Sequence, residues 1–160
     1  MELYKLELEA AKKALKTAQH MLTMTYNVVN DPKLFITMAQ RLFSACISTM
    51  RAILFCEEFH QKIPQFNQDL DAMFELFKIR TTRRYALNPD YIKLIDDLDT
   101  IVNGYKKSSV AFKRKQNYII CDDKYNTNVV SKDKLQDLLK KTEAFIADAE
   151  KMVQRMENKL

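Results

Sequence analysis

The sequence predicts an all-α protein: an antiparallel four- or five-helix bundle with a small β-hairpin-like insertion before the last helix. The 160 residues contain one glycine and three prolines. A sheet-rich fold needs more glycine for turns with positive φ and for strand bends. Apolar residues also recur at alternating steps of three and four along most of the chain, which is the spacing of one buried helix face. A globular all-α packing with steeper helix crossings fits the same periodicity.

The first two expected helices cover residues 2–29 and 32–59. Between them, Asp31 can accept a hydrogen bond from the free N–H groups of a helix start. Pro32 suits the first helical position because it lacks an N–H. Charged residues occupy one face of the first segment, whereas the second segment is apolar almost all round. We therefore expect the second helix to be the most buried element.

A third helix is expected over residues 66–84. An Asn-Pro-Asp sequence at residues 88–90 repeats the start signal, and a fourth helix follows over residues 91–105 with its apolar residues on one face. Apolar residues recur with helical spacing once more near the C-terminus, which predicts one further, last helix.

The region before the last helix has a different pattern. Two short β-prone runs, residues 118–121 and 125–130, flank a polar turn and predict the hairpin. Because a two-stranded hairpin is marginal in water, it must pack on the helices. Ser131 can cap the last helix, whose first turn contains Asp133. No linker or repeat divides the chain, which indicates one domain over residues 1–160.

The composition is that of a folded protein without a membrane-spanning segment. Hydrophobic residues make up 47% of the chain, but no apolar run approaches the ~20 residues that cross a bilayer. The N-terminus is amphipathic and acidic, unlike a signal peptide, so cytoplasmic residence is expected. Cys46, Cys56 and Cys121 lack close spacing and predict free thiols in a reducing compartment.

Motifs for catalytic, cofactor or metal chemistry are incomplete. Glu57 and His60 form the Glu-x-x-His pair of di-iron bundles, but such a site needs a second pair and two more glutamates. Cys56 and His60, at i and i+4, supply only two zinc ligands. Cys121 has no recognised nucleophile sequence around it, and a single glycine excludes Gly-rich phosphate loops. We predict a non-enzymatic protein with no metal site and no cofactor.

Two basic segments are the strongest functional signal. Hydroxyl and aromatic side chains are interleaved with both, a composition suited to phosphate contacts and base stacking. The alternative is a solvated connection whose charges balance acidic neighbours such as Asp96, Asp97 and Asp99. The candidate nucleic-acid-binding residues are Arg80, Arg83, Arg84, Lys106, Lys107, Lys113, Arg114 and Lys115.

The first third of the chain resembles HEPN-type domains. The likeness is carried by the small residues and following aliphatic run of RLFSACISTMRAILF (residues 41–55) and by the similar AAKKAL (residues 10–15). The resemblance implies a small all-α bundle, often dimeric, from a family of ribonuclease toxins, nucleotidyltransferase partners and RNA-processing modules. Active members carry an arginine, four to six residues and then a histidine, whereas eight residues separate Arg51 from His60. No catalytic residue is therefore carried over.

These observations predict a non-enzymatic helical module that binds RNA or a protein of a nucleic-acid-handling complex. The alternative is a protein–protein scaffold or homodimer that uses an apolar face of the first or last helix. A third class, a degenerate ribonuclease, would need His20 or His60 as its acid–base group. Salt discriminates among them, because phosphate binding weakens steeply as salt rises.

Overall fold

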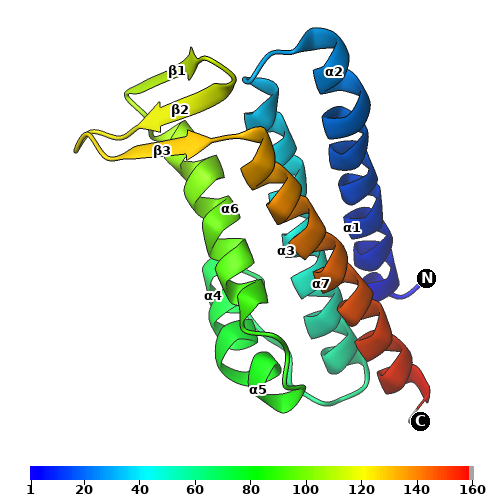
Figure 1. Cartoon of the computed structure of the whole chain (residues 1–160). Coiled ribbons are helices and arrows are strands. Elements are labelled where there is room, and N and C mark those ends of the chain that lie inside the picture. The colour runs from blue at the N-terminus through cyan, green and yellow to red at the C-terminus, as the bar shows by residue number, and fades with distance from the viewer. Residues whose placement is uncertain (159–160) are drawn as a thin grey trace.

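The computed structural model describes residues 1–158 and is mostly helical, with a small antiparallel sheet before the last helix (Figure 1). This confirms the predicted helical character of the chain and the position of the β insertion. In chain order the elements are α1 (Leu3–His20), a π-helical turn (Met21–Thr25), α2 (Tyr26–Val29), α3 (Leu34–Phe59), α4 (Leu70–Leu76), a second π-helical turn (Phe77–Thr81), α5 (Thr82–Arg84), α6 (Asp90–Lys106), β1 (Val110–Arg114), β2 (Asn117–Cys121), β3 (Thr127–Val130) and α7 (Lys132–Asn158).

Two of the helical rods contain a π-helical turn. The backbone stays right-handed at Met21 and Tyr26, so α1 and α2 continue into one another over residues 3–29. It also stays right-handed at Phe77 and Thr82, which joins α4 to α5 over residues 70–84. The predicted first helix is therefore confirmed as one continuous rod.

Side-chain hydrogen bonds mark three of the predicted helix starts. Asp31 Oδ1 accepts the N–H of Lys33 at 3.0 Å, and Asn88 Oδ1 accepts the N–H of Asp90 at 3.0 Å. Ser131 Oγ accepts an N–H two residues inside α7 at 3.1 Å. The bonds to Asp90 and Lys134 satisfy N–H groups that α6 and α7 leave unpaired at their first turns, whereas the bond to Lys33 lies in the turn directly before α3, which begins at Leu34. These bonds confirm the start signals read from the sequence.

Helix α3 is the central element, as its nearly all-round apolar sequence predicts. It contacts α1, α6 and α7, and Figure 1 shows it behind α7 and between α1 and α6. Its largest fully buried side chains include Phe35, Met38, Leu42, Met50 and Ile53. Because these residues point to several sides, α3 supplies the core for each of its neighbours.

The third helix begins later than predicted. Phe66 lies in the connection before α4, and the helix starts at Leu70. The side chain of Asn67 accepts the N–H of Asp69 at 2.9 Å, a local bond that competes with helical pairing. The ring of Phe66 still packs on Phe55, with centroids 5.4 Å apart. This contact with Phe55, and not a place on a helix face, explains why the position is apolar.

The expected hairpin is a three-stranded sheet, ordered β1-β2-β3 with antiparallel neighbours. The prediction missed β1 because four of its five residues are exposed, so it lacks the buried alternation that identifies a strand. The third strand is shorter than predicted, since Tyr125 has a φ of 63° and ends the preceding turn. Tyr118, Ile120 and Val130 attach the sheet to the helical core.

None of the helices within residues 1–158 combines the length and the hydropathy that crossing a bilayer requires.

Candidate functional site

The two basic segments lie at opposite ends of α6 (Figure 1). The arginine segment, residues 80–84, ends shortly before α6 begins, and the second segment, residues 106–115, starts at its last residue. The 17 residues of α6 separate the segments by about 25 Å. Asp96, Asp97 and Asp99 lie between them, and Asp96 is exposed. The structure therefore does not bring the eight predicted residues onto one surface.

The excess positive charge of the chain is concentrated around the sheet. Residues 106–134, which we call the sheet end, contain eight Lys or Arg residues and three Asp residues. Their net charge of +5 equals that of the whole chain, so the remaining residues sum to zero. A field of one sign over one end of a molecule attracts a partner of the opposite sign.

Five of the eight predicted residues belong to the sheet end, and all five are exposed. Lys113 Nζ lies 3.7 Å from Asp31 Oδ1, in a solvent-exposed pair that adds little stability. The other four make no ion pair within residues 1–158: Lys106, Lys107, Arg114 and Lys115. Their charges are available to a partner.

Two of the three acidic residues of the sheet end, Asp122 and Asp123, accept hydrogen bonds from residues of the sheet end itself. Asp122 Oδ1 accepts the N–H groups of Asn126 at 2.8 Å and Lys124 at 2.9 Å. These bonds, with that of Asn126 the largest contribution, lower the pKa of the Asp122 carboxyl. Asp123 accepts a hydrogen bond from Ser109. The turn between β2 and β3 thus uses two carboxylates internally, while the neighbouring lysines face solvent.

The outer face of the sheet is apolar. Phe112 on β1 pairs with Ile119 on β2, which pairs with Val129 on β3. Phe112 is 41% exposed and Val129 45%, whereas Ile119 between them is 8% exposed. Ile119 does not belong to the helical core, because alternate residues of a strand point to opposite faces. The aromatic ring of Phe112 is therefore partly exposed at the edge of an apolar row, beside the free cations.

Strand β1 forms an edge of the sheet. One side pairs with β2, and no strand pairs with the other side among residues 1–158. An edge strand presents unpaired N–H and C=O groups, which natural proteins often protect with charged side chains. Lys113 and Arg114 lie on this strand, and Lys115 begins its turn with a φ of 57°. The edge is thus both polar and positively charged.

The arginine segment is built differently, because Arg84 is held by a buried carboxylate. Arg84 Nη1 donates to Glu57 Oε2 at 2.6 Å, and the hydroxyl of Thr81 donates to Glu57 Oε1 at 3.0 Å. Glu57 is fully buried. This burial raises the pKa of its carboxyl, while the bonds from Thr81 and Arg84 oppose the shift. Arg80 and Arg83 remain exposed.

Sequence reasoning missed the role of Glu57, although a signal was present. Glu57 follows Met50, Ile53 and Leu54 at the spacing of the buried face of α3. A carboxylate at such a position needs a cation or several hydrogen-bond donors. The spacing therefore indicated a buried ion pair, but not that its partner would be Arg84.

Cys56 and His60, which have the spacing of two metal ligands, lie side by side without further ligands around them among the described residues. Cys56 Sγ lies 3.6 Å from His60 Nδ1, but burial raises the pKa of this thiol to about 12. It is therefore protonated at neutral pH and a poor nucleophile. No group of three or more His, Cys, Asp or Glu residues in the described part of the chain is arranged to hold a metal ion. Within residues 1–158, no hydrogen bond or ion pair joins Arg51 to His60.

The sheet end combines free cations, a polar strand edge and an exposed aromatic ring. Lysine and arginine side chains neutralise phosphates, and aromatic rings stack with unpaired bases. This combination can therefore hold an anionic chain that carries flat apolar groups. Neither a scan of protein-family models nor a search of curated proteins found a match to this chain.

Proposed function

We propose that the protein is a non-enzymatic module, an antiparallel helical bundle, that binds single-stranded RNA or another single-stranded nucleic acid at the sheet end. The observation that carries the proposal is the concentration of the whole net charge of +5 in residues 106–134. Phosphate contacts supply most of the affinity of such binding. Five of the predicted residues provide these contacts: Lys106, Lys107, Lys113, Arg114 and Lys115.

The apolar outer face supports a single strand over a duplex. Phe112 is exposed beside Arg114 on β1, and every unpaired base can stack on an aromatic ring. In a duplex the bases are already stacked and paired, so the ring contributes nothing. Single-stranded nucleic acid therefore uses both the charge and the aromatic row.

The acidic residues of α6 argue against one strand that spans both basic segments. Asp96 is exposed on α6, so a strand that followed this helix from the sheet end to the arginine segment would meet its carboxylate. Like charges at close range repel, and this repulsion disfavours a phosphate chain along that path. The proposed surface is therefore the sheet end alone.

The test compares two charge-reversal variants of equal net charge. Fluorescence anisotropy of a labelled single-stranded RNA is measured with the wild type and with Lys113→Glu/Arg114→Glu/Lys115→Glu. The matched control is Lys78→Glu/Arg80→Glu/Arg83→Glu, whose three residues are exposed at the other end of α6. We expect the first variant to lose about 100-fold in affinity at low salt and the control to lose no more than about threefold.

The salt dependence provides a second criterion. Wild-type affinity should fall steeply as salt rises, and the sheet-end variant should show a shallower slope because fewer counterions are released. No binding at low salt, or an equal loss in both variants, would overturn the proposal. Single-stranded DNA and duplex RNA run in parallel test the preference for an unpaired strand.

A second candidate function is self-association through an apolar face near the N-terminus. Leu3 on α1 is 50% exposed and Phe59 on α3 is 56% exposed. Both line a recess of about 200 Å³ together with Tyr4 and Phe55. A second copy of the chain could cover these side chains. Light scattering over a concentration series tests it: a monomer at the highest concentration excludes the homodimer, and a Leu3→Glu variant should dissociate one.

A further inference from the structure

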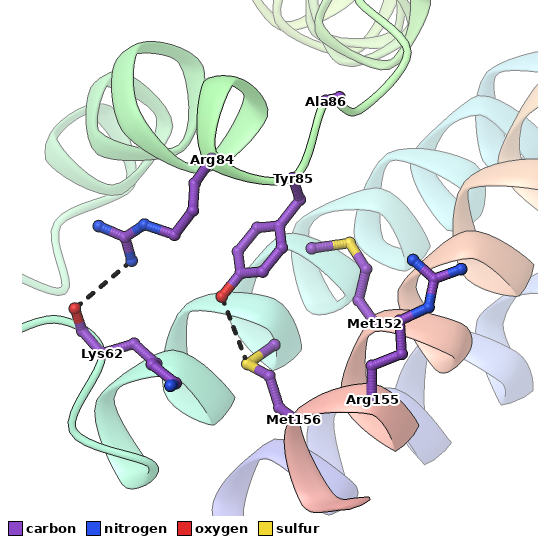
Figure 2. Close-up of a pocket in the computed structure, with 7 residues that line it drawn as sticks. All are labelled: Lys62, Arg84, Tyr85, Ala86, Met152, Arg155 and Met156. Atoms are coloured by element: carbon purple, nitrogen blue, oxygen red, sulfur yellow. Dashed lines mark hydrogen bonds between the residues drawn. The ribbon is translucent and has the colours of Figure 1, made fainter. Parts of the chain in front are cut away.

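A pocket lies near the arginine segment, at the end of α6 remote from the sheet. It has a volume of about 430 Å³ and is bounded by the residues after α3, the end of α5 and the C-terminal part of α7 (Figure 2). This volume falls within the range of pockets that enclose small molecules. No residue of the sheet end lines it.

Three cations surround the pocket: Lys62, Arg84 and Arg155. Figure 2 shows Lys62 and Arg84 on one side of Tyr85 and Arg155 on the other. The charge of Arg84 is balanced by Glu57, and its guanidinium also donates to the carbonyl of Lys62 at 3.4 Å. Arg84 is therefore fixed in place as part of the wall.

The other two cations are not balanced. Lys62 and Arg155 are exposed and make no ion pair within residues 1–158. The acidic neighbour on α7, Glu157, pairs with Lys5 at 3.5 Å instead. The pocket consequently has an excess of positive charge, which favours an anionic group between its walls.

The floor of the pocket is apolar and adaptable. It is formed by Tyr85 and by two methionines of α7, Met152 and Met156. The hydroxyl of Tyr85 donates to Met156 Sδ at 3.6 Å, which orients the ring (Figure 2). Thioether side chains adjust to the shape of a bound group and contact aromatic rings favourably. The floor therefore suits an apolar or aromatic body of variable shape.

An adjoining recess carries charges of both signs. This recess of about 180 Å³ shares Tyr85, Met152 and Arg155 with the pocket and adds Asp148 and Lys151. Asp148 accepts a hydrogen bond from Tyr91, and its carboxylate offsets part of the positive charge there. The excess of positive charge is therefore greater in the pocket itself, where an anionic head fits beside Lys62 and Arg155 with an apolar body over the methionines.

We propose that this pocket binds a small organic anion, in which one phosphate or carboxylate is joined to an apolar or aromatic body. Arg155 and Lys62 hold the anionic head, and Arg84 forms the wall beside it. Tyr85, Met152 and Met156 contact the body. The site is independent of nucleic-acid binding at the sheet end.

The test uses methionine methyl groups as reporters. The full chain is labelled with ¹³C-methyl methionine, and its eight methionines are assigned with Met→Leu variants. Two anions are titrated, adenosine 5′-monophosphate and octanoate, with adenosine and 1-octanol as their uncharged counterparts. We expect one or both anions to shift the Met152 and Met156 signals saturably. Met24, which is 57% exposed and remote from the pocket, should not shift.

Two variants locate the anionic head. Arg155→Glu should weaken binding at least about tenfold, because it replaces a charge-assisted contact with repulsion. Lys140→Glu, an equal reversal at an exposed position of α7 outside the pocket, should leave it unchanged. A response to the monophosphate alone identifies a phosphate head on an aromatic body, and a response to octanoate alone identifies a carboxylate head on an aliphatic body.

Three results would overturn the proposal. The first is the absence of any Met152 or Met156 shift at millimolar concentrations of either anion. The second is an equal response to an anion and its uncharged counterpart. The third is undiminished binding in Arg155→Glu.

Discussion

The arginine segment and the sheet end contain the same kinds of basic residue, yet their charges are in different states. Arg84 pairs with the fully buried Glu57 at 2.6 Å, whereas Arg114 and Lys115 are exposed without an ion pair within residues 1–158. A run of basic residues in a sequence therefore does not show how many of its charges are available to a partner.

The difference has a physical cause in what each region packs against. A buried carboxylate costs free energy unless a cation and hydrogen-bond donors surround it, and Arg84 and Thr81 meet this need. The β strands have no buried acid to neutralise. Lys113 has only the partly exposed Asp31 as its partner, at 3.7 Å, and water screens such a pair.

The largest expected effect is on the free energy of unfolding, which should depend on the buried ion pair much more than on the exposed one. Glu57→Ala removes the acceptor of both Arg84 and Thr81 and should lower the free energy of unfolding by about 1–3 kcal/mol. Asp31→Asn, which removes the charge beside Lys113 but keeps the Oδ1 that accepts the Lys33 N–H, should change it little. Urea denaturation followed by circular dichroism measures both. Equal losses in the two variants would contradict the distinction between the regions.

The second effect concerns the aromatic ring at the sheet end. Phe112→Ala should weaken single-stranded RNA binding by about tenfold, since stacking of one base contributes about 1–3 kcal/mol. Phe59→Ala is the matched control, because Phe59 is exposed to a similar degree but lies at the end of α3. Fluorescence anisotropy compares the two variants with the wild type. If Phe59→Ala weakens RNA binding as much as Phe112→Ala does, the proposal that a base stacks on Phe112 is wrong.

The smallest effect is a pH dependence of stability at the buried carboxylate. Burial raises the pKa of Glu57 above its ordinary value of 4.5, so above pH 4.5 the folded state retains a proton that the unfolded state releases. The contribution of Glu57 to stability is therefore lost as pH rises from 4.5 through the raised pKa. Glu57→Gln cannot titrate, and the stability of the wild type relative to this variant should fall over that interval.

Denaturation curves of both proteins at several pH values measure this difference. The subtraction removes the contribution of other titrating groups that the two proteins share. A wild type that gains stability over the variant as pH rises would show that Arg84 and Thr81 outweigh burial and lower the pKa instead.

Helix starts could be predicted because they depend on a few consecutive residues. The bonds of Asp31, Asn88 and Ser131 span two or three positions, so an Asx-Pro or Ser signal contains the whole interaction. Apolar spacing is a less specific signal, and it misled the prediction at Phe66. Spacing cannot distinguish a residue on a helix face from a loop side chain that packs on α3.

Strand β1 and the state of Arg84 could not be predicted, because both depend on contacts between distant residues. Glu57 and Arg84 are 27 positions apart, and β1 is ordered by pairing with β2 while four of its five residues stay exposed. Periodicity places Glu57 on the buried face of α3 but does not identify Arg84 as its partner, and β1 lacks a buried alternation altogether.

The separation of the candidate residues into two groups, at the two ends of α6, also depends on how distant parts of the chain pack together. Composition and periodicity established the mostly helical class, the central position of α3 and the candidate cations, since burial of apolar faces follows from spacing alone. Tertiary structure placed the basic segments at opposite ends of α6 and paired Arg84 with Glu57. It also left the sheet end with the net positive charge facing solvent, because charge pairing depends on which side chains meet across the fold.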